Sequence, residues 1–295
     1  MKKALAIDVG GTKIYNTIVN EKGEITGDIE KRPTPKSFQA IKKAFEEIIS
    51  RYEDEVDVIA FSTCGAVNNA NNKILGSTGN IAAGYPDMNF EALSRKKVFV
   101  ENDANAAAWA EHILGASRGM PYSVMITLGT GVGGGIILNN RIYKGKSGAA
   151  GEMHFKMRTD KHRKCTCGSW DCFESYAAGT GLKRTAEEIS KNPDITTYDV
   201  IGGWKNNDAM MTEIFNRWQD DILDGLVGLA NIFDPDVFVL SGSMAEFTDT
   251  DYLTENVNKQ IITSPTKVVK AQTGNYAGMI GAALLALGVG LDGGC

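Results

Sequence analysis

Two clusters of glycines, each directly after an apolar run, are the residues of this chain best suited to bind a polyanion. The first turn is Gly10-Gly11-Thr12-Lys13, and the second turn runs from Gly129 to Gly135. Glycine has no Cβ, so its backbone N–H can approach a phosphate closely at a tight turn. Two such turns, far apart in the sequence, predict that one triphosphate is gripped from both sides.

The polar residues near these turns have two interpretations each. Asp8, directly before the first turn, either caps the turn or holds Mg²⁺ beside the phosphates. Lys13 is either a phosphate partner or a solvated charge. Gly242 follows an apolar run and is either a contact for a base or ribose or only a backbone turn. The residues assigned to ATP are Asp8, Gly10, Gly11, Thr12, Lys13, Gly129, Thr130, Gly131, Gly133 and Gly242.

Neither glycine cluster fits the two best-known nucleotide motifs. Residues 129–134 satisfy G-x-G-x-x-G, but that fingerprint needs a helix directly after it. Here a second apolar run and an Asn139-Asn140 turn follow, which predicts a β-hairpin. Gly145-Lys146-Ser147 resembles the end of a P-loop, but the first glycine of that motif would fall on Asn140. We therefore expect neither a Rossmann nor a P-loop site.

A carboxylate follows a strand pattern in the sequence Glu101-Asn102-Asp103. Residues 98–100 predict the strand, and residues 103–114 predict a helix. The carboxyl end of a strand is where α/β sheets bind ligands, and a helix N-terminus favours an anion. Asp103 is either a helix N-cap or a base that accepts a proton from a substrate hydroxyl, with Asn102 orienting that substrate.

Three cysteines within eight residues predict a metal site. The candidate ligands are His154, Cys165, Cys167 and Cys172, which are the ligand types of a closed tetrahedral Zn²⁺ site. His162 competes with His154, and three free thiols are the alternative. A closed site is structural, so the metal would fix the metal loop (residues 152–175). Glu152 and Glu174 in that loop either contact a polyol or lie on the surface.

Composition excludes several classes of protein. The chain has 295 residues, of which 43% are hydrophobic and 23% charged, which is ordinary for a globular protein with a sizeable core. A net charge of −5 without blocks of like charge argues against a nucleic-acid surface. Five cysteines, three of them clustered, favour a reducing compartment. With no run of membrane-spanning length and no signal peptide pattern, we expect a cytoplasmic protein without membrane or nucleic-acid partners.

The elements that must position these residues repeat along the chain. Strands are predicted over 4–9, over 14–19 and from Glu24, followed by a linker over 32–35 and a helix that Ser37 caps. A similar pattern restarts at residues 123–128. The repeat predicts an internal duplication and two α/β domains with a cleft between them. We expect a smaller domain over 1–120, onto which a helix at about 277–290 packs back, and a larger domain over 121–276 that contains the metal loop.

These motifs together resemble the ROK family of sugar kinases, within the actin/hexokinase ATPase superfamily. Residues 8–13 and 129–135 resemble its two phosphate motifs, and residues 101–108 resemble its sugar and catalytic-base segment. Residues 165–174 resemble its zinc and sugar motif, and residues 234–242 its adenosine region. The match covers essentially the whole chain. The resemblance implies a two-domain, ribonuclease H-like α/β fold with an interdomain cleft.

The resemblance also assigns roles. It implies that Asp103 is the base, that His154, Cys165, Cys167 and Cys172 hold zinc, and that the cofactors are ATP, Mg²⁺ and structural Zn²⁺. The residues that it places against the sugar are Gly65, Asn80, Asn102, Asp103, Glu152, His154 and Glu174. A homodimer is typical of the family.

The chain departs from the family pattern around the metal loop, and other segments resemble one branch of the family. Glu152-Met153-His154 is one residue shorter than the usual E-x-G-H, and Asp171 replaces a glycine. Ser62-Thr63, Pro33-Thr34-Pro35 and residues 107–111 look closer to bacterial N-acetylmannosamine kinases. We therefore predict transfer of the γ-phosphoryl group of ATP to the 6-hydroxyl of N-acetylmannosamine, a reaction of sialic-acid catabolism. The alternative is a glucokinase or another hexose kinase.

Two other classes of function compete with this interpretation. One is a sugar-responsive ROK regulator without its DNA-binding domain. ROK regulators carry a helix-turn-helix before the phosphate motif. Here that motif begins at Asp8, which leaves no room for one. The other is a sugar-independent ATPase, and the sugar-facing residues around Asp103 and Glu174 argue against it.

Overall fold

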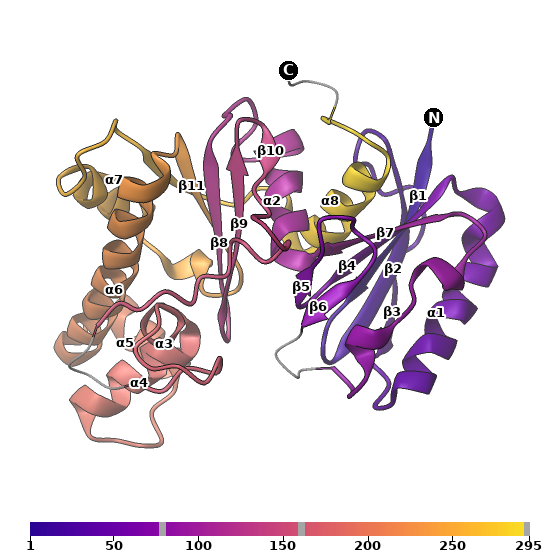
Figure 1. Ribbon diagram of the computed structural model, residues 1–295. Coiled ribbons are helices and arrows are strands. Elements are labelled where there is room, and N and C mark those ends of the chain that lie inside the picture. The colour runs from indigo at the N-terminus through magenta and orange to yellow at the C-terminus, as the bar shows by residue number, and fades with distance from the viewer. Residues whose placement is uncertain (77–80, 159–162, 292–295) are drawn as a thin grey trace. The chain divides into compact units, whose positions relative to one another are not determined.

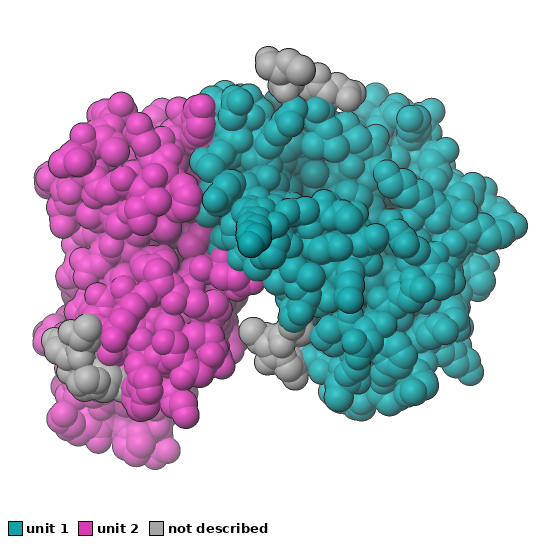
Figure 2. All heavy atoms as spheres, in the orientation of Figure 1, with its two compact units in different colours: residues 1–121, 135–151, 272–295 teal, residues 122–134, 152–271 magenta. Residues whose placement is uncertain are grey.

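The structure, a computed structural model, describes residues 1–76, 81–158 and 163–291. Contacts within the chain divide it into two compact units, which Figure 2 shows in different colours. Unit 1 comprises residues 1–121, 135–151 and 272–295, and unit 2 comprises residues 122–134 and 152–271. Within the described residues no helix combines the length and the apolar composition needed to cross a membrane.

Unit 1 is built on a five-stranded sheet (Figure 1). Its strands are β1 (Lys3–Val9), β2 (Lys13–Asn20), β3 (Glu30–Pro33), β4 (Val58–Thr63) and β7 (Lys97–Asn102). The order is β3-β2-β1-β4-β7, with β1, β4 and β7 parallel and β2 and β3 antiparallel to their neighbours. The register pairs Asp8 with Ser62 and Ser62 with Glu101, so the ends of three parallel strands bring these residues into one row.

The two faces of this sheet carry side chains of different size. On β1, Leu5, Ile7 and Val9 point to the face covered by α1 (Phe38–Tyr52), whereas Ala4 and Ala6 point to the other face. The helices on the alanine face are α2 (Asp103–Leu114) and α8 (Ala277–Ala286). Small side chains let these two helices approach the sheet and each other closely. The helix that Ser37 was predicted to cap is confirmed, since its hydroxyl accepts from Ala40 N at 3.4 Å.

The contact between α2 and α8 leaves no space for a side chain at one position. A Cβ on Gly281 would lie 1.7 Å from the carbonyl oxygen of Ala106. We expect Gly281→Ala to destabilise the protein by about 3 kcal/mol, the upper end of what overpacking a core costs, because two helix backbones must separate. Thermal unfolding measures this. The matched control is Gly228→Ala, in α6 (Ala209–Phe233), where an added Cβ meets nothing within 4 Å. Equal melting temperatures for the two variants would show that the α2–α8 contact is not as tight as described.

A second five-stranded sheet has the order β10-β9-β8-β11-β12. Its strands are β8 (Ser123–Leu128), β9 (Val132–Leu138), β10 (Arg141–Ile142), β11 (Val237–Ser241) and β12 (Lys267–Lys270). β11 pairs parallel with β8 and with β12, and β10 pairs antiparallel with β9. This repeats the arrangement of the first sheet, as the duplicated pattern predicts.

The hairpin predicted after the second turn is confirmed. β9 follows β8 where a Rossmann fold would have a helix, and a two-residue turn connects β9 to β10. Asn139 and Asn140 have φ of 53° and 60°, the left-handed values that a type I′ turn requires and that asparagine tolerates.

One predicted strand was wrong. We expected a third strand from Glu24 and a linker over 32–35, whereas β3 begins at Glu30 and includes Pro33. β3 is an edge strand, and an edge strand tolerates a proline because one side of its backbone needs no hydrogen bonds from the sheet. Residue Ile25 forms only an isolated bridge with Val19.

The remaining elements connect or cover the two sheets. β5 (Ala66–Val67) and β6 (Ile74–Gly76) form a small hairpin. The other α-helices are α3 (Glu174–Ala177), α4 (Gly179–Ser190), α5 (Thr197–Lys205) and α7 (Thr250–Asn258). The short 3-10 helices are η1 (Glu53–Glu55), η2 (Tyr85–Asp87), η3 (Glu91–Leu93), η4 (Ala245–Phe247) and η5 (Gly274–Tyr276).

Candidate active site

The first turn joins β1 to β2 in unit 1, and hydrogen bonds within the protein hold its backbone in place. Gly10 N donates to Lys13 O at 3.0 Å. Thr34, which is buried, donates from Oγ1 to Gly10 O at 2.6 Å and from its backbone N to Thr12 O at 3.0 Å. The shape of the turn is therefore fixed without a ligand. Sequence reasoning placed Thr34 in a linker and missed this role, since it depends on a contact between residues far apart in the chain.

Asp8 lies beside this turn at the end of β1. Ser62 Oγ donates to Asp8 Oδ1 at 2.7 Å. Burial raises the pKa of the Asp8 carboxyl, and the hydrogen bond from Ser62 offsets part of that effect. A divalent cation next to Asp8 would favour its ionised form, so the residue fits the predicted Mg²⁺ role. Gly278 packs over the pair, because a Cβ there would lie 2.7 Å from Ser62 Oγ.

The start of α2 assigns the cap to Asn102 and leaves Asp103 exposed. Asn102 Oδ1 accepts from Asn105 N at 3.0 Å, and Asn102 Nδ2 donates to Gly65 O at 3.1 Å. Asp103 is the first helical residue, and its Oδ1 accepts from Ala104 N at 2.8 Å. Of the two interpretations of Asp103, the N-cap is thus excluded. An exposed carboxylate on a rigid helix start has the placement that a general base needs.

The buried carboxylate of Glu101 connects the start of α2 to the chain around it. Its carboxylate accepts from Lys144 Nζ at 3.0 Å, from Asn71 Nδ2 at 2.7 Å and from Asn102 N at 2.9 Å. The side chains of Glu101 and Lys144 are only 2% and 14% exposed, and Lys144 also donates to Asn68 O. Because a buried carboxylate needs this many partners, the network holds Asn102 and Asp103 in one position. Sequence reasoning gave Lys144 no role, since nothing in the local pattern connects it to Glu101.

The second turn joins β8 to β9 and is closed within unit 2. Gly129 N donates to Gly131 O at 3.0 Å, and Gly133 N donates to Thr127 Oγ1 at 3.0 Å. Val132 N donates to Glu174 Oε2 at 3.0 Å. Among these described residues, the N–H groups left to offer a phosphate are those at positions 130 and 131. The Gly133 N–H, which was assigned to ATP, is used by the protein.

Gly242 has a structural reason to be glycine. Its φ is 89°, and a Cβ would lie 2.4 Å from the carbonyl oxygen of Leu128. Met244 N donates to the same oxygen at 2.9 Å. The residue therefore forms a tight turn against the end of β8, next to the start of the second turn.

The four predicted metal ligands meet in unit 2. His154, Cys165, Cys167 and Cys172 each offer one ligand atom, and all four atoms lie within 4.8 Å of one another. Cys165 Sγ is 3.6 Å from His154 Nδ1, and Cys167 Sγ is 3.6 Å from Cys172 Sγ. Ideal tetrahedral zinc, with bonds of about 2.3 Å to sulfur and about 2.05 Å to nitrogen, gives edges of about 3.6–3.8 Å. The cluster therefore fits a zinc ion in both ligand type and size.

The pKa values of the three thiols bear on whether the cluster holds a cation. Burial raises the pKa of the Cys172 thiol to about 12, and hydrogen bonds with Cys167 and Cys165 add to this rise. Burial also raises the pKa of the Cys165 thiol, whereas at Cys167 burial is outweighed by hydrogen bonds from Ser169 and the neighbouring thiols, which lower its pKa. A cation is the partner that makes such thiolates stable.

The substitution of Asp171 for the family's glycine is accommodated by the backbone and by new partners. Asp171 has φ of 59°, a left-handed conformation that aspartate tolerates better than most residues. Its Oδ1 accepts from Arg163 N at 2.8 Å and from the Tyr176 hydroxyl at 2.7 Å. The departure therefore leaves the ligand geometry intact.

Glu152 and Glu174 occupy different environments. Glu152 is half exposed, and its Oε2 lies 3.7 Å from His154 Nε2, which is beyond hydrogen-bond distance, so its carboxylate can meet a polar ligand. Burial opposes ionisation of Glu174, but hydrogen bonds from Thr166 and Val132 outweigh that effect and lower its pKa. The Glu174 carboxylate is therefore an acceptor of hydrogen bonds from within the protein.

Two residues considered in the sequence lie outside the described residues. Asn80 was expected to face the sugar, and His162 competed for the fourth metal position. Within the described part of the chain, His154 completes the cluster.

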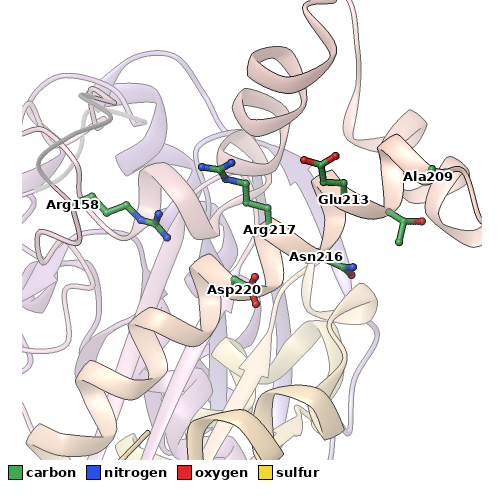
Figure 3. A pocket seen from close by; sticks show the side chains of 7 residues that line it. Arg158, Ala209, Glu213, Asn216, Arg217 and Asp220 are labelled. Atoms are coloured by element: carbon green, nitrogen blue, oxygen red, sulfur yellow. The ribbon is translucent and has the colours of Figure 1, made fainter.

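A hollow on the surface of unit 2 is not part of this site. It has a volume of about 730 Å³ and is lined by Arg158 and by residues of α6 (Figure 3). Glu213, Arg217 and Asp220 place charges of both signs along it, and the Arg158 guanidinium is bound to Asp221 and Asp224. None of the residues predicted to bind sugar, nucleotide or metal lines it.

Comparison with known proteins covers nearly the whole chain. The model of the ROK family matches residues 4–289. A glucokinase of Streptomyces coelicolor is 32% identical in an alignment of 321 positions, gaps included, that covers 97% of this chain and 98% of that protein. An N-acetylmannosamine kinase of Yersinia pseudotuberculosis is 31% identical over 294 residues, which cover 97% and 99%.

A solved structure shows the same architecture. The ROK-family glucokinase of Streptomyces griseus, crystallised in complex with glucose and AMPPNP, superposes with a TM-score of 0.77. It is 29% identical, and the match covers 97% of this chain and 99% of that one. The expected α/β fold of the ROK kinases is therefore confirmed.

Proposed function

We propose, because the chain belongs to the ROK family, that it is an ATP-dependent sugar kinase acting on the 6-hydroxyl of N-acetylmannosamine. The observation that carries the proposal is the exposed carboxylate of Asp103 at the start of α2, held in place by the Asn102 cap and the buried Glu101 network. The two relatives that match this chain over nearly their whole length are named as kinases.

In the proposed reaction Asp103 accepts the proton of the sugar hydroxyl while the hydroxyl oxygen attacks the γ-phosphorus. The bond from that phosphorus to the β–γ bridging oxygen breaks, so sugar phosphate and ADP form. The N–H groups of the two glycine turns bind the phosphate oxygens and stabilise their charge. The residues proposed to face the sugar are Gly65, Asn102, Glu152, His154 and Glu174. Asn80, as the resemblance implies, belongs to the same set.

Two metals accompany the proposal. Mg²⁺ would be held at Asp8 and would neutralise charge on the phosphates. Zn²⁺ would be held by His154, Cys165, Cys167 and Cys172 and would fix the metal loop without taking part in the chemistry. The homodimer that the resemblance implies remains a prediction.

The choice of sugar rests on sequence features. Ser62-Thr63, Thr34 and residues 107–111 resemble the N-acetylmannosamine kinases. The second candidate is a glucokinase, because the glucokinase and the N-acetylmannosamine kinase relatives are equally similar to this chain, at 32% and 31% identity.

A parallel assay of ADP release separates the candidates. Glucose, N-acetylmannosamine, N-acetylglucosamine, mannose and fructose are each supplied with ATP and Mg²⁺. We expect kcat/KM for N-acetylmannosamine to exceed that of every other sugar by about 10-fold or more, the discrimination that one well-fitted substituent provides. A highest value for glucose would establish the second candidate. ADP release that no sugar stimulates would refute the kinase function.

A further inference from the structure

The two carboxylate oxygens of Glu174 bind two different segments of unit 2. Oε2 accepts from Val132 N at 3.0 Å, in the second turn. Oε1 accepts from Thr166 Oγ1 at 2.5 Å, and Thr166 lies between the ligands Cys165 and Cys167 in the sequence. Cys165 Sγ is 3.4 Å from the same oxygen. Glu174 is only 7% exposed. One buried side chain thus connects the metal cluster to a proposed phosphate-binding turn.

The second turn is shaped to receive this carboxylate. A Cβ on Gly131 would lie 2.6 Å from Glu174 Oε2, so a side chain there would displace this carboxylate from its present position. The chain just after Glu174 adds another contact, because Gly179 N donates to Gly129 O at 2.8 Å. The segment that leaves the metal loop therefore holds the turn at residues 129, 131 and 132.

These contacts determine which donors the turn presents. The Val132 N–H is committed to Glu174, which fixes the peptide groups before it and so directs the N–H groups of Thr130 and Gly131. Glu174 also carries a negative charge next to a turn proposed to bind a polyanion. If it were released from its partners, its carboxylate would repel the phosphates or bind the N–H groups meant for them.

We propose that Glu174 is a positioning residue through which the metal cluster sets the conformation of the second turn, so that loss of the metal weakens nucleotide binding at a site that the metal does not touch. This rests on the proposed function, since it takes the turn to bind ATP. This role concerns the second turn and is separate from the sugar contact that the family resemblance implies for Glu174.

The test is calorimetric binding of Mg²⁺-AMPPNP to the full chain, with metal content measured by mass spectrometry. We expect removal of the metal from wild type by a chelator to raise the Kd by about 10-fold, the cost of losing one hydrogen bond to a charged group. Glu174→Gln, loaded with metal, should show a similarly raised Kd and should not respond further to the chelator. Circular dichroism confirms that each variant is folded.

A second variant separates coupling from a local effect at the turn. Thr166→Val removes a donor on the metal side of Glu174, from a residue that is not proposed to touch nucleotide or sugar. It should keep its metal and still bind AMPPNP more weakly. The matched control is Glu187→Gln in α4, which removes a half-buried charge paired only with Lys183 among the ion pairs described, and should leave both readouts unchanged.

The outcomes are distinct. An unchanged Kd in metal-free wild type and in Glu174→Gln would overturn the coupling, whatever KM that variant shows for sugar. Wild type that phosphorylates sugar but shows no coupling would refute only this inference. Wild type that binds no nucleotide would refute the proposed function together with it.

Discussion

Asp103→Asn is expected to lower kcat by about 10²- to 10⁴-fold, the range that general acid–base catalysis contributes. Asparagine keeps the size of the side chain and an oxygen that can accept from Ala104 N, but it cannot take a proton from a sugar hydroxyl. Because Asn102 caps α2, the helix start does not depend on the carboxylate. The fold, the melting temperature and the affinity for AMPPNP should therefore stay close to those of wild type.

Steady-state turnover and nucleotide binding on the same preparation check this expectation. Asp28→Asn serves as a control, since it removes an exposed carboxylate from the same unit and should leave kcat unchanged. Turnover by Asp103→Asn within a few-fold of wild type would remove Asp103 from the role of base. A loss of nucleotide binding would mean that the residue is needed to build the site.

Cys172→Ser is expected to abolish stable metal binding. Cys172 is buried in the cluster, and a serine hydroxyl is a poor zinc ligand that does not ionise at neutral pH. We expect the metal affinity to fall by at least about 100-fold, the upper end of what loss of an outer-shell partner alone costs. The melting temperature should fall with it, because metal binding contributes to folding free energy.

Metal analysis of the purified variants and of wild type after dialysis tests this prediction. Cys64→Ser is the matched control, because Cys64 lies in unit 1, outside the cluster, and its replacement should leave the metal content unchanged. If Cys172→Ser retained one equivalent of metal, or if wild type never contained any, the four side chains would be a packing cluster and not a metal site.

Local patterns predicted much of this fold. The helix over 103–114 and the strand over 123–128 have the bounds expected from their apolar spacing. The Asn139-Asn140 turn was predictable because few residues adopt the left-handed conformation that it needs. The edge strand β3 was missed because a proline normally interrupts a strand, and only its position at the edge of the sheet permits it.

The residue types of the candidate site were predictable from the sequence, but most of the hydrogen bonds that position them were not. The cysteine spacing predicted a metal cluster, and the four ligand atoms do lie together. The hydrogen bonds from Thr34 to the first turn and from Lys144 to Glu101 were not predictable, because each joins residues far apart in the chain. For the same reason the sequence did not show that the Glu174 carboxylate is already bound by Val132 and Thr166.

Phosphorus NMR of the products shows whether the phosphoryl group of ATP reaches a sugar hydroxyl with Asp103 as the base. N-acetylmannosamine and glucose are supplied in separate reactions. We expect each equivalent of ATP consumed to yield ADP and a phosphomonoester whose signal is split by the two protons of a CH₂ group, and we expect Asp103→Asn to yield almost none. ADP and inorganic phosphate as the only new products, with either sugar and with the rest of the panel, would contradict the proposed transfer to a sugar.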